Sequence, residues 1–246
     1  MQKIAPLFAL ILVFAAAAVA QPGGATTTPA KPVAATNPAD MAKATLAAHG
    51  GDKLAKMSTL VVRGEASITG PFNQVIPGTF AMAIAGNRYF FDMANLVQPI
   101  KQIYNGTDTY SSVPGFSLPP MTSLGLPLLA KAGVTGYAIT ETSDPKKKRK
   151  GFRITSPEGY YTDFYTDEKT GQMKTYESSY ETGNGQTVTT SVEIDSFQTV
   201  EGVIVPKVYA QRIEFGSITA YVNFKAKDIL VNSKLDDDVF AFPKAP

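Results

Sequence analysis

The sequence predicts a mainly β protein in which a single antiparallel sheet curls into a barrel or half-barrel, with an N-terminal helix and an apolar helical insert. Three observations support this prediction. Apolar and polar residues alternate over most of the chain after Leu60, which is the period of a half-buried strand. Turn residues interrupt the alternation at short intervals, which indicates about twelve strands joined in sequence. A helix start precedes the first strand, and one apolar segment lacks the alternation.

The clearest alternation lies near the C-terminus. It runs over residues 208–215, breaks at Gly216 and resumes over residues 218–224. A period of two on both sides of a glycine predicts two long antiparallel strands joined by a tight turn. A short polar stretch and an apolar run, residues 239–242, follow the second strand.

The other strands are predicted from the same pattern and from Gly, Pro, Asn and Asp between the runs. A hairpin is expected over residues 100–112, because Asn105-Gly106 is the strongest signal for a two-residue turn. Single strands are expected at residues 61–68, 79–84, 88–92, 136–143, 151–156, 159–166, 172–182 and 187–196.

A helix is predicted to begin at Asn37. Asn37 can cap it, Pro38 suits the first helical position, and Asp40 favours the positive end of the helix dipole. Gly50 and Gly51 end the helix, and a second short helical piece is expected over residues 52–57.

The N-terminal residues are expected to be an export signal rather than part of the fold. Lys3, an apolar run and Ala18-Val19-Ala20 match a secretory signal peptide, residues 1–20, with cleavage before Gln21. No Cys follows the run, so no lipid anchor can form there. Residues 21–36 are rich in Pro, Thr and Ala, which predicts a flexible linker before one domain over residues 37–246. The expected location is periplasmic or secreted.

Composition excludes several classes of chemistry. The chain has no Cys and one His, which excludes disulfides, cysteine nucleophiles and cysteine-ligated metals. Without Lys3, 22 basic residues face 21 acidic ones, a net charge of about +1 that does not suggest a nucleic-acid partner. No catalytic triad can be assembled, and we expect neither an enzyme nor a metal or other cofactor.

The insert is the segment of residues 116–132, Phe-Ser-Leu-Pro-Pro-Met-Thr-Ser-Leu-Gly-Leu-Pro-Leu-Leu-Ala-Lys-Ala. It has no alternation and no charge before Lys131. Leu124, Leu128 and Leu129 would line one side of a short helix after Pro120. Such a segment either plugs an apolar cavity or forms an exposed apolar patch.

Several polar motifs have ordinary interpretations. His49 is best explained as a helix C-terminal cap or a solvated residue, and residues 236–238, three aspartates, as a solvated turn without calcium-loop spacing. The basic run at 146–150 is expected in a solvated loop, with weak docking to an anionic membrane surface as the alternative. Tyrosines cluster at positions 160, 161, 165, 176 and 180, which suits a strand surface and leaves a protein-partner interface open.

Both ends of the domain resemble a known family. Residues 47–54, Ala-Ala-His-Gly-Gly-Asp-Lys-Leu, resemble the start of the LolA-like proteins, often called outer membrane lipoprotein-sorting proteins. Residues 200–206 resemble a strand start of that family, and residues 232–240 resemble its closing motif with paired Asp and a final Phe. The resemblance spans residues 38–246. It implies an unclosed β-barrel of about eleven strands, helices on the concave apolar face, and a periplasmic carrier of acyl chains. No ligand-contacting residue of the lipoprotein carriers can be matched.

The residues alone favour binding over catalysis. A cysteine-free β chain with a large apolar insert suits a lipid or lipoprotein carrier, a transport chaperone that shields an acyl chain. The alternative is a periplasmic sensor or protein-interaction module on the same scaffold, with an envelope protein as partner. The expected ligand-binding residues are Ile68, Phe80, Met82, Ile84, Phe90, Phe116, Leu118, Leu124, Leu128 and Leu129. A one-residue slip in strand register would invert the set on the sheet.

Overall fold

A computed structural model describes residues 37–69, 74–97, 99–114, 118–144, 149–182 and 185–243. The expected signal peptide, the linker, Phe116 and residues 146–148 of the basic run lie outside the described residues.

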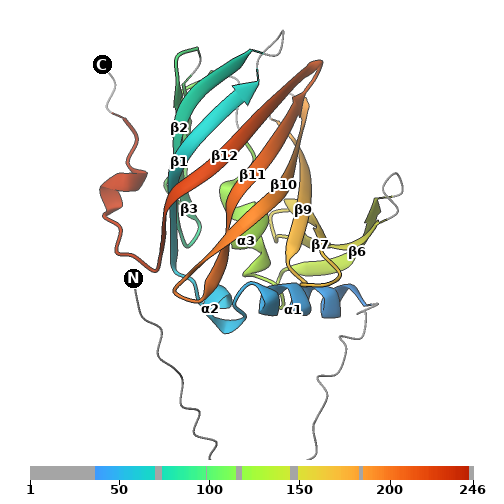
Figure 1. Ribbon diagram of the computed structural model, residues 1–246. Coiled ribbons are helices and arrows are strands. Elements are labelled where there is room, and N and C mark those ends of the chain that lie inside the picture. The colour runs from blue at the N-terminus through green and yellow to red at the C-terminus, as the bar shows by residue number, and fades with distance from the viewer. Residues whose placement is uncertain are drawn as a thin grey trace, which may run out of the picture. The chain divides into compact units, whose positions relative to one another are not determined.

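The fold is one antiparallel sheet of 12 strands that curls without closing (Figure 1). The predicted single sheet is therefore confirmed. The order across it is β5-β4-β3-β2-β1-β12-β11-β10-β9-β8-β7-β6, so the first and last strands pair at its centre. The strands are β1 (Thr59–Thr69), β2 (Val75–Ala85), β3 (Arg88–Asn95), β4 (Ile100–Tyr104), β5 (Thr109–Ser111), β6 (Ala138–Asp144), β7 (Arg149–Thr155), β8 (Tyr161–Thr166), β9 (Met173–Glu181), β10 (Thr187–Val200), β11 (Val203–Phe215) and β12 (Ile218–Val231).

The insert crosses the open side of the curl. β5 and β6 follow each other in the chain but form opposite edges of the sheet, so the segment between them must span the gap. Its described part contains the 3-10 helix η2 (Met121–Ser123) and the helix α3 (Gly125–Leu129). Figure 1 shows α3 inside the curl. Leu124 has an extended backbone and precedes α3, so it is not part of the helical face predicted for it.

The N-terminal helices lie across one end of the sheet (Figure 1). α1 (Pro38–Ala48) begins as predicted, because the Asn37 side chain accepts a hydrogen bond from Ala39 N at 2.9 Å. Gly50 has a φ of 115° and lies against the backbone of Gly202 in the β10–β11 turn, where a side chain would clash. α2 (Asp52–Ala55) follows and buries Leu54.

The two turn predictions had different outcomes. Gly216 joins β11 to β12 with a φ of 57°, as the alternation indicated. The two-residue turn at Asn105-Gly106 is wrong, because Tyr104 pairs with Thr109 and four residues form the loop. The Asn105 carboxamide oxygen accepts hydrogen bonds from Thr107 N and Asp108 N at 2.9 and 2.8 Å, so its side chain shapes a longer loop.

Each face of the sheet carries a hydrophobic cluster. The larger one fills the concave face and includes Phe80, Phe224 and the leucines of the insert. The smaller one lies on the convex face, where the 3-10 helix η3 (Asp237–Phe240) places Phe240 over Val61, Ala83 and Ile103. The C-terminal apolar run therefore covers the face of the sheet opposite to the insert.

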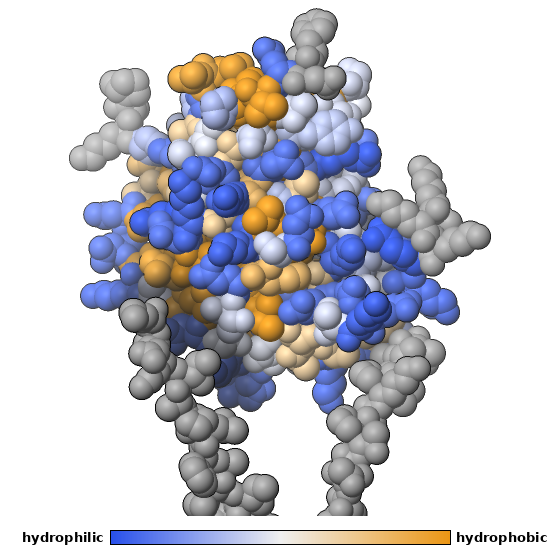
Figure 2. Space-filling model, in the orientation of Figure 1, coloured by the Kyte–Doolittle hydropathy of each residue, from blue (hydrophilic) through white to orange (hydrophobic). Residues whose placement is uncertain are grey.

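One end of the sheet exposes large apolar side chains. Figure 2 shows hydrophobic residues gathered at the upper end of the molecule. Val75 begins β2, and Leu96 and Val97 follow β3; their exposed fractions are 66%, 92% and 68%. Gly78 pairs with Asn95, so the three residues belong to the same end of the sheet. We call them the apolar rim.

Candidate functional site: an apolar cavity under the insert

The site begins with the way the insert is tied to the sheet. Gln102 of β4 is 1% exposed and bonds both backbone groups of Leu118: its Nε2 donates to Leu118 O at 3.0 Å, and its Oε1 accepts from Leu118 N at 2.7 Å. On the other edge of the sheet, the Thr162 hydroxyl donates to Ser123 O at 2.6 Å. These polar contacts fix the two ends of the segment 118–123, and apolar packing holds the segment after it.

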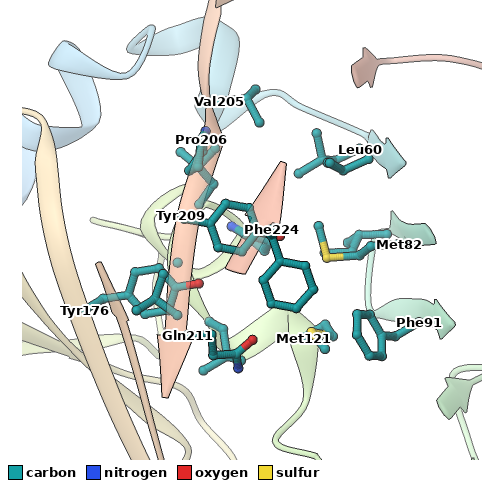
Figure 3. A pocket seen from close by; sticks show the side chains of 17 residues that line it. Leu60, Met82, Phe91, Met121, Tyr176, Val205, Pro206, Tyr209, Gln211 and Phe224 are labelled. Carbon is teal, nitrogen blue, oxygen red and sulfur yellow. The ribbon is translucent and has the colours of Figure 1, made fainter. Parts of the chain in front are cut away.

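The insert covers an apolar cavity of about 80 Å³ on the concave face (Figure 3). Residues from seven strands and from the insert meet there. The lining consists of Leu60, Val62, Met82, Ile84, Phe91, Met121, Leu124, Gly125, Leu126, Pro127, Tyr176, Val192, Val205, Pro206, Tyr209, Gln211 and Phe224. No charged residue is among them, so the cavity suits an uncharged hydrocarbon chain.

Stacked aromatic rings form the floor of the cavity. The rings of Tyr209 and Phe224 are stacked at 4.9 Å, and Phe80 contacts the Phe224 ring edge-on at the same distance. Gly125 of the insert has a φ of 49°, and a Cβ there would lie 3.1 Å from the Tyr176 ring. Glycine therefore lets the insert approach this ring closely.

The few polar groups of the cavity are neutral. Gln211 donates a hydrogen bond to the Thr190 hydroxyl at 2.7 Å. Burial raises the pKa of Tyr176 and Tyr209 well above the ordinary value of 10.0, so both hydroxyls stay protonated at physiological pH. They can bond an ester or amide group of a ligand without adding charge.

The predicted ligand-binding residues that the structure describes, all except Phe116, fall into three groups. Met82, Ile84 and Leu124 line the cavity. The second group lies in the concave core without lining it: Ile68, Phe80, Leu118, Leu128 and Leu129. Phe90 forms the third group, because it packs against the convex cluster and Lys101 lies over its ring at 5.7 Å. In β3 it is Phe91 that faces the cavity, a shift of one residue.

Sequence reasoning missed most of the cavity wall. Tyr176, Val205, Tyr209 and Phe224 come from strands far apart in the sequence, and only the curl of the sheet brings them together. The alternation over residues 208–215 placed Tyr209 and Gln211 on the same face of the strand. It did not indicate that this face of β11 lines the cavity.

His49 is a structural residue at the end of α1. It is fully buried, and its Nε2 accepts a hydrogen bond from Met173 N at 3.0 Å, which leaves Nδ1 to donate to Ile204 O at 2.7 Å. Of its two predicted interpretations, the helix cap is confirmed and the solvated residue is wrong. Burial lowers its pKa, so the ring is neutral at physiological pH.

Other charged groups lie outside the cavity. In the described part of the chain, no three His, Cys, Asp or Glu residues are placed to hold a metal ion. Asp236, Asp237 and Asp238 are exposed, and Asp237 pairs with Arg88 at 2.8 Å. None of the described helices is long and apolar enough to cross a membrane.

The Gln102 contacts predict that a single substitution loosens the insert. Gln102→Leu leaves both backbone groups of Leu118 and the Tyr89 hydroxyl without this partner, so the free energy of unfolding should fall by about 2 kcal/mol. Amide exchange in residues 118–124 should become faster than in the wild type. Gln172→Leu, at a half-buried site outside the insert, is the matched control. It should change neither the free energy of unfolding nor the amide exchange of residues 118–124. Unchanged exchange in Gln102→Leu would show that packing alone holds the insert.

The fold and the cavity define a class: an open antiparallel half-barrel whose concave face is covered by helices and encloses an apolar cavity. A LolA superfamily protein from Nitrosomonas europaea has this fold, with a TM-score of 0.50 at 11% identity over 85% of this chain and 99% of that one. The chain therefore has a LolA-like fold, as its motifs indicated.

Two further solved structures are similar at lower scores. A DUF1329 family protein from Desulfovibrio piger matches with a TM-score of 0.47 at 11% identity, over 84% of this chain and 98% of that one. A domain from Vibrio parahaemolyticus, described as an outer membrane lipoprotein-sorting protein, matches with a TM-score of 0.41 at 11% identity, over 82% and 95%. No protein-family model and no curated protein sequence matches the chain.

Proposed function

We propose that this protein is a carrier that shields the acyl chain of a lipid or lipoprotein in the apolar cavity under the insert. The observation that carries the proposal is the lining of the cavity, which is apolar except for neutral hydroxyl and amide groups. The LolA-like fold supports the same class. The alternative, a sensor module on this scaffold, would not require an acyl chain in the cavity.

The size of the cavity requires the insert to move during binding. A volume of about 80 Å³ is well below the 300 to 1,000 Å³ of typical ligand sites, taken as a rough range. Leu126, Leu128 and Leu129 of the insert are at most 4% exposed against the sheet. An acyl chain would take over their contacts with the sheet, which offsets the cost of displacing them.

The concave face of β2 offers the chain a route. Ile76, Phe80, Met82 and Ile84 alternate along this strand, and it begins at the apolar rim. Met82 and Ile84 line the cavity, and Ile76 lies next to the rim residue Val75. An acyl chain could therefore move from the rim to the cavity along a continuous apolar surface.

A chain-length series tests the proposal. Each methylene buried contributes about 0.8 kcal/mol, so the affinity for saturated fatty acids should rise by about fourfold per carbon from octanoate upward until the cavity is full. Displacement of a fluorescent fatty acid by each homologue measures the slope. An affinity that does not depend on chain length would contradict the carrier proposal and favour the sensor.

Hydrogen exchange tests the movement of the insert. Residues 118–132 should exchange faster than β10–β12 in the free protein, because few hydrogen bonds tie the insert to the sheet. Saturating palmitate should slow this segment, because the acyl chain fills the space beneath it. Equal protection with and without palmitate would mean that the insert is ordinary core.

Location is a further part of the proposal. The secretory signal predicts a mature chain that begins at Gln21 and is recovered in the periplasmic fraction or the medium. The intact mass of the protein from its host checks this start. A mass that includes residues 1–20 would contradict it.

A further inference from the structure

A second cavity lies beside the insert, with a volume of about 470 Å³. We call it the tyrosine cleft, because Tyr89, Tyr104, Tyr137 and Tyr160 line it. Its size falls within the rough range of 300 to 1,000 Å³ for small-molecule sites. The insert separates it from the apolar cavity: Leu124 and Leu126 line the cavity, Ser123 and Leu128 line the cleft, and Pro127 lines both.

One wall of the cleft is rigid and aromatic. The rings of Tyr89 and Tyr104 lie 5.8 Å apart with 31° between their planes. The Tyr89 hydroxyl accepts a hydrogen bond from Gln102 Nε2 at 2.7 Å, and the Tyr104 hydroxyl donates to Gly106 O at 2.9 Å. Both rings are therefore held in place. Tyr89 is 2% exposed and supports the half-buried Tyr104, whose ring offers the surface for stacking.

Near the other edge of the sheet, three residues that line the cleft have side-chain hydroxyls without a hydrogen-bond partner in the described part of the chain. Tyr137 precedes β6, and Ser156 and Tyr160 belong to the turn between β7 and β8. Among the described residues, neither tyrosine hydroxyl has a hydrogen-bond partner. Ser156 is 6% exposed, and its Oγ makes no hydrogen bond within the described part of the chain. A buried hydroxyl without a partner is uncommon, and a bound ligand or water is one explanation.

The charges of the cleft cancel. Lys131 and Glu158 are the charged residues that line it, one of each sign. Neither forms an ion pair with another described residue. Burial, with a smaller contribution from the charge of Glu158, raises the pKa of Tyr137, so this hydroxyl stays neutral. A cleft with no net charge cannot compensate a phosphate or another multiply charged ligand.

We infer that the tyrosine cleft binds an uncharged, hydroxyl-rich ring, such as a monosaccharide or the sugar unit of a larger molecule. Each sugar hydroxyl both donates and accepts, which matches the mixture of tyrosine, serine and charged groups in the lining. The apolar face of the ring can stack on the tyrosines, which present large ring surfaces with few rotatable bonds. The inference does not depend on acyl-chain binding in the apolar cavity.

Titration of the mature, isotopically labelled protein with D-glucose, D-galactose and N-acetyl-D-glucosamine tests this assignment. We expect at least one sugar to shift the amide resonances around Tyr104, Tyr137 and Tyr160, with a Kd of about 1 to 10 mM. Tyr160→Ala should lower the affinity for that sugar by about tenfold. Tyr160→Phe keeps the ring and should lower the affinity less. Tyr221→Ala removes an exposed tyrosine on β12 outside the cleft and should leave the affinity unchanged.

Three results would overturn the assignment. The first is no shift in the cleft with any of the three sugars at about 100 mM. The second is sugar binding that Tyr160→Ala and Tyr137→Ala leave unchanged, while both variants keep the thermal midpoint of the wild type. The third is tighter binding of adenosine or inorganic phosphate than of every sugar, because the cleft would then select a base or an anion. Loss of fatty acid binding with sugar binding intact would affect only the carrier proposal.

Discussion

Replacing His49 by alanine is expected to lower the free energy of unfolding by about 3 kcal/mol, because two buried hydrogen bonds and a filled volume are lost together. The ring joins the end of α1 to β11 through Ile204 and to the start of β9 through Met173. It also contacts the Phe197 ring edge-on at 5.3 Å. Urea denaturation measures the loss. A decrease in the free energy of unfolding below about 1 kcal/mol would show that the ring does not hold α1 against β9 and β11.

The same residue should make stability depend on pH. Burial places the pKa of folded His49 below the unfolded value of 6.5, so the unfolded chain binds a proton that the folded chain does not. Stability should be full above pH 6.5 and fall below it, by at most about 1.4 kcal/mol per pH unit, until the lowered folded pKa is reached. His49 is the only histidine of the chain, so His49→Gln should remove this dependence near pH 6. If the free energy of unfolding of His49→Gln keeps the same dependence on pH, carboxyl groups and not His49 cause that dependence.

Placing a charge in the apolar cavity should abolish ligand uptake at a small cost in stability. Met121 is half-buried on the insert and lines the cavity, and Figure 3 shows it between Phe91 and Gln211. In Met121→Glu, the carboxylate can stay hydrated in the free protein, but an entering acyl chain must desolvate it. Binding of a fluorescent fatty acid should fall by at least about tenfold, while the thermal midpoint changes little.

Two other substitutions separate charge from shape at this position. Met121→Leu keeps an apolar side chain of similar volume and should retain binding within about threefold. Met121→Gln has nearly the length of glutamate without its charge and should give an intermediate loss. Full binding by Met121→Glu would remove the residue from the ligand site. Binding lost equally in Met121→Leu would point to shape and not to charge.

The elements that local patterns define were predictable from the sequence. β11 and β12 alternate with a period of two around Gly216, and α1 carries its cap at Asn37. Both signals depend on residues that are close in the chain. The turn at Asn105 was not predictable in this way, because its side chain bonds two backbone amides and competes with the two-residue turn.

The lining of the cavity was predictable only in part, because it depends on register and on the curl of the sheet. Phe90 and Phe91 are adjacent aromatic residues, and the pattern alone does not show which one faces inward. Leu128 is 1% exposed and lines the tyrosine cleft, so a charge there would disturb the core as well as any ligand. Tyr176 and Tyr209 reach the cavity from β9 and β11, a contact between strands that no local pattern encodes.

The most direct test of the carrier proposal uses the methionine methyl groups. Met82 and Met121 line the apolar cavity, whereas Met57 follows α2 and Met173 is buried next to His49. In protein labelled with ¹³C at the methionine methyls, palmitate should shift the signals of Met82 and Met121 and give nuclear Overhauser effects from both to the methylene protons of the chain. Met57 and Met173 should remain unchanged. Shifts that spare Met82 and Met121, or no contact between them and the chain at saturation, would contradict an acyl-chain site under the insert.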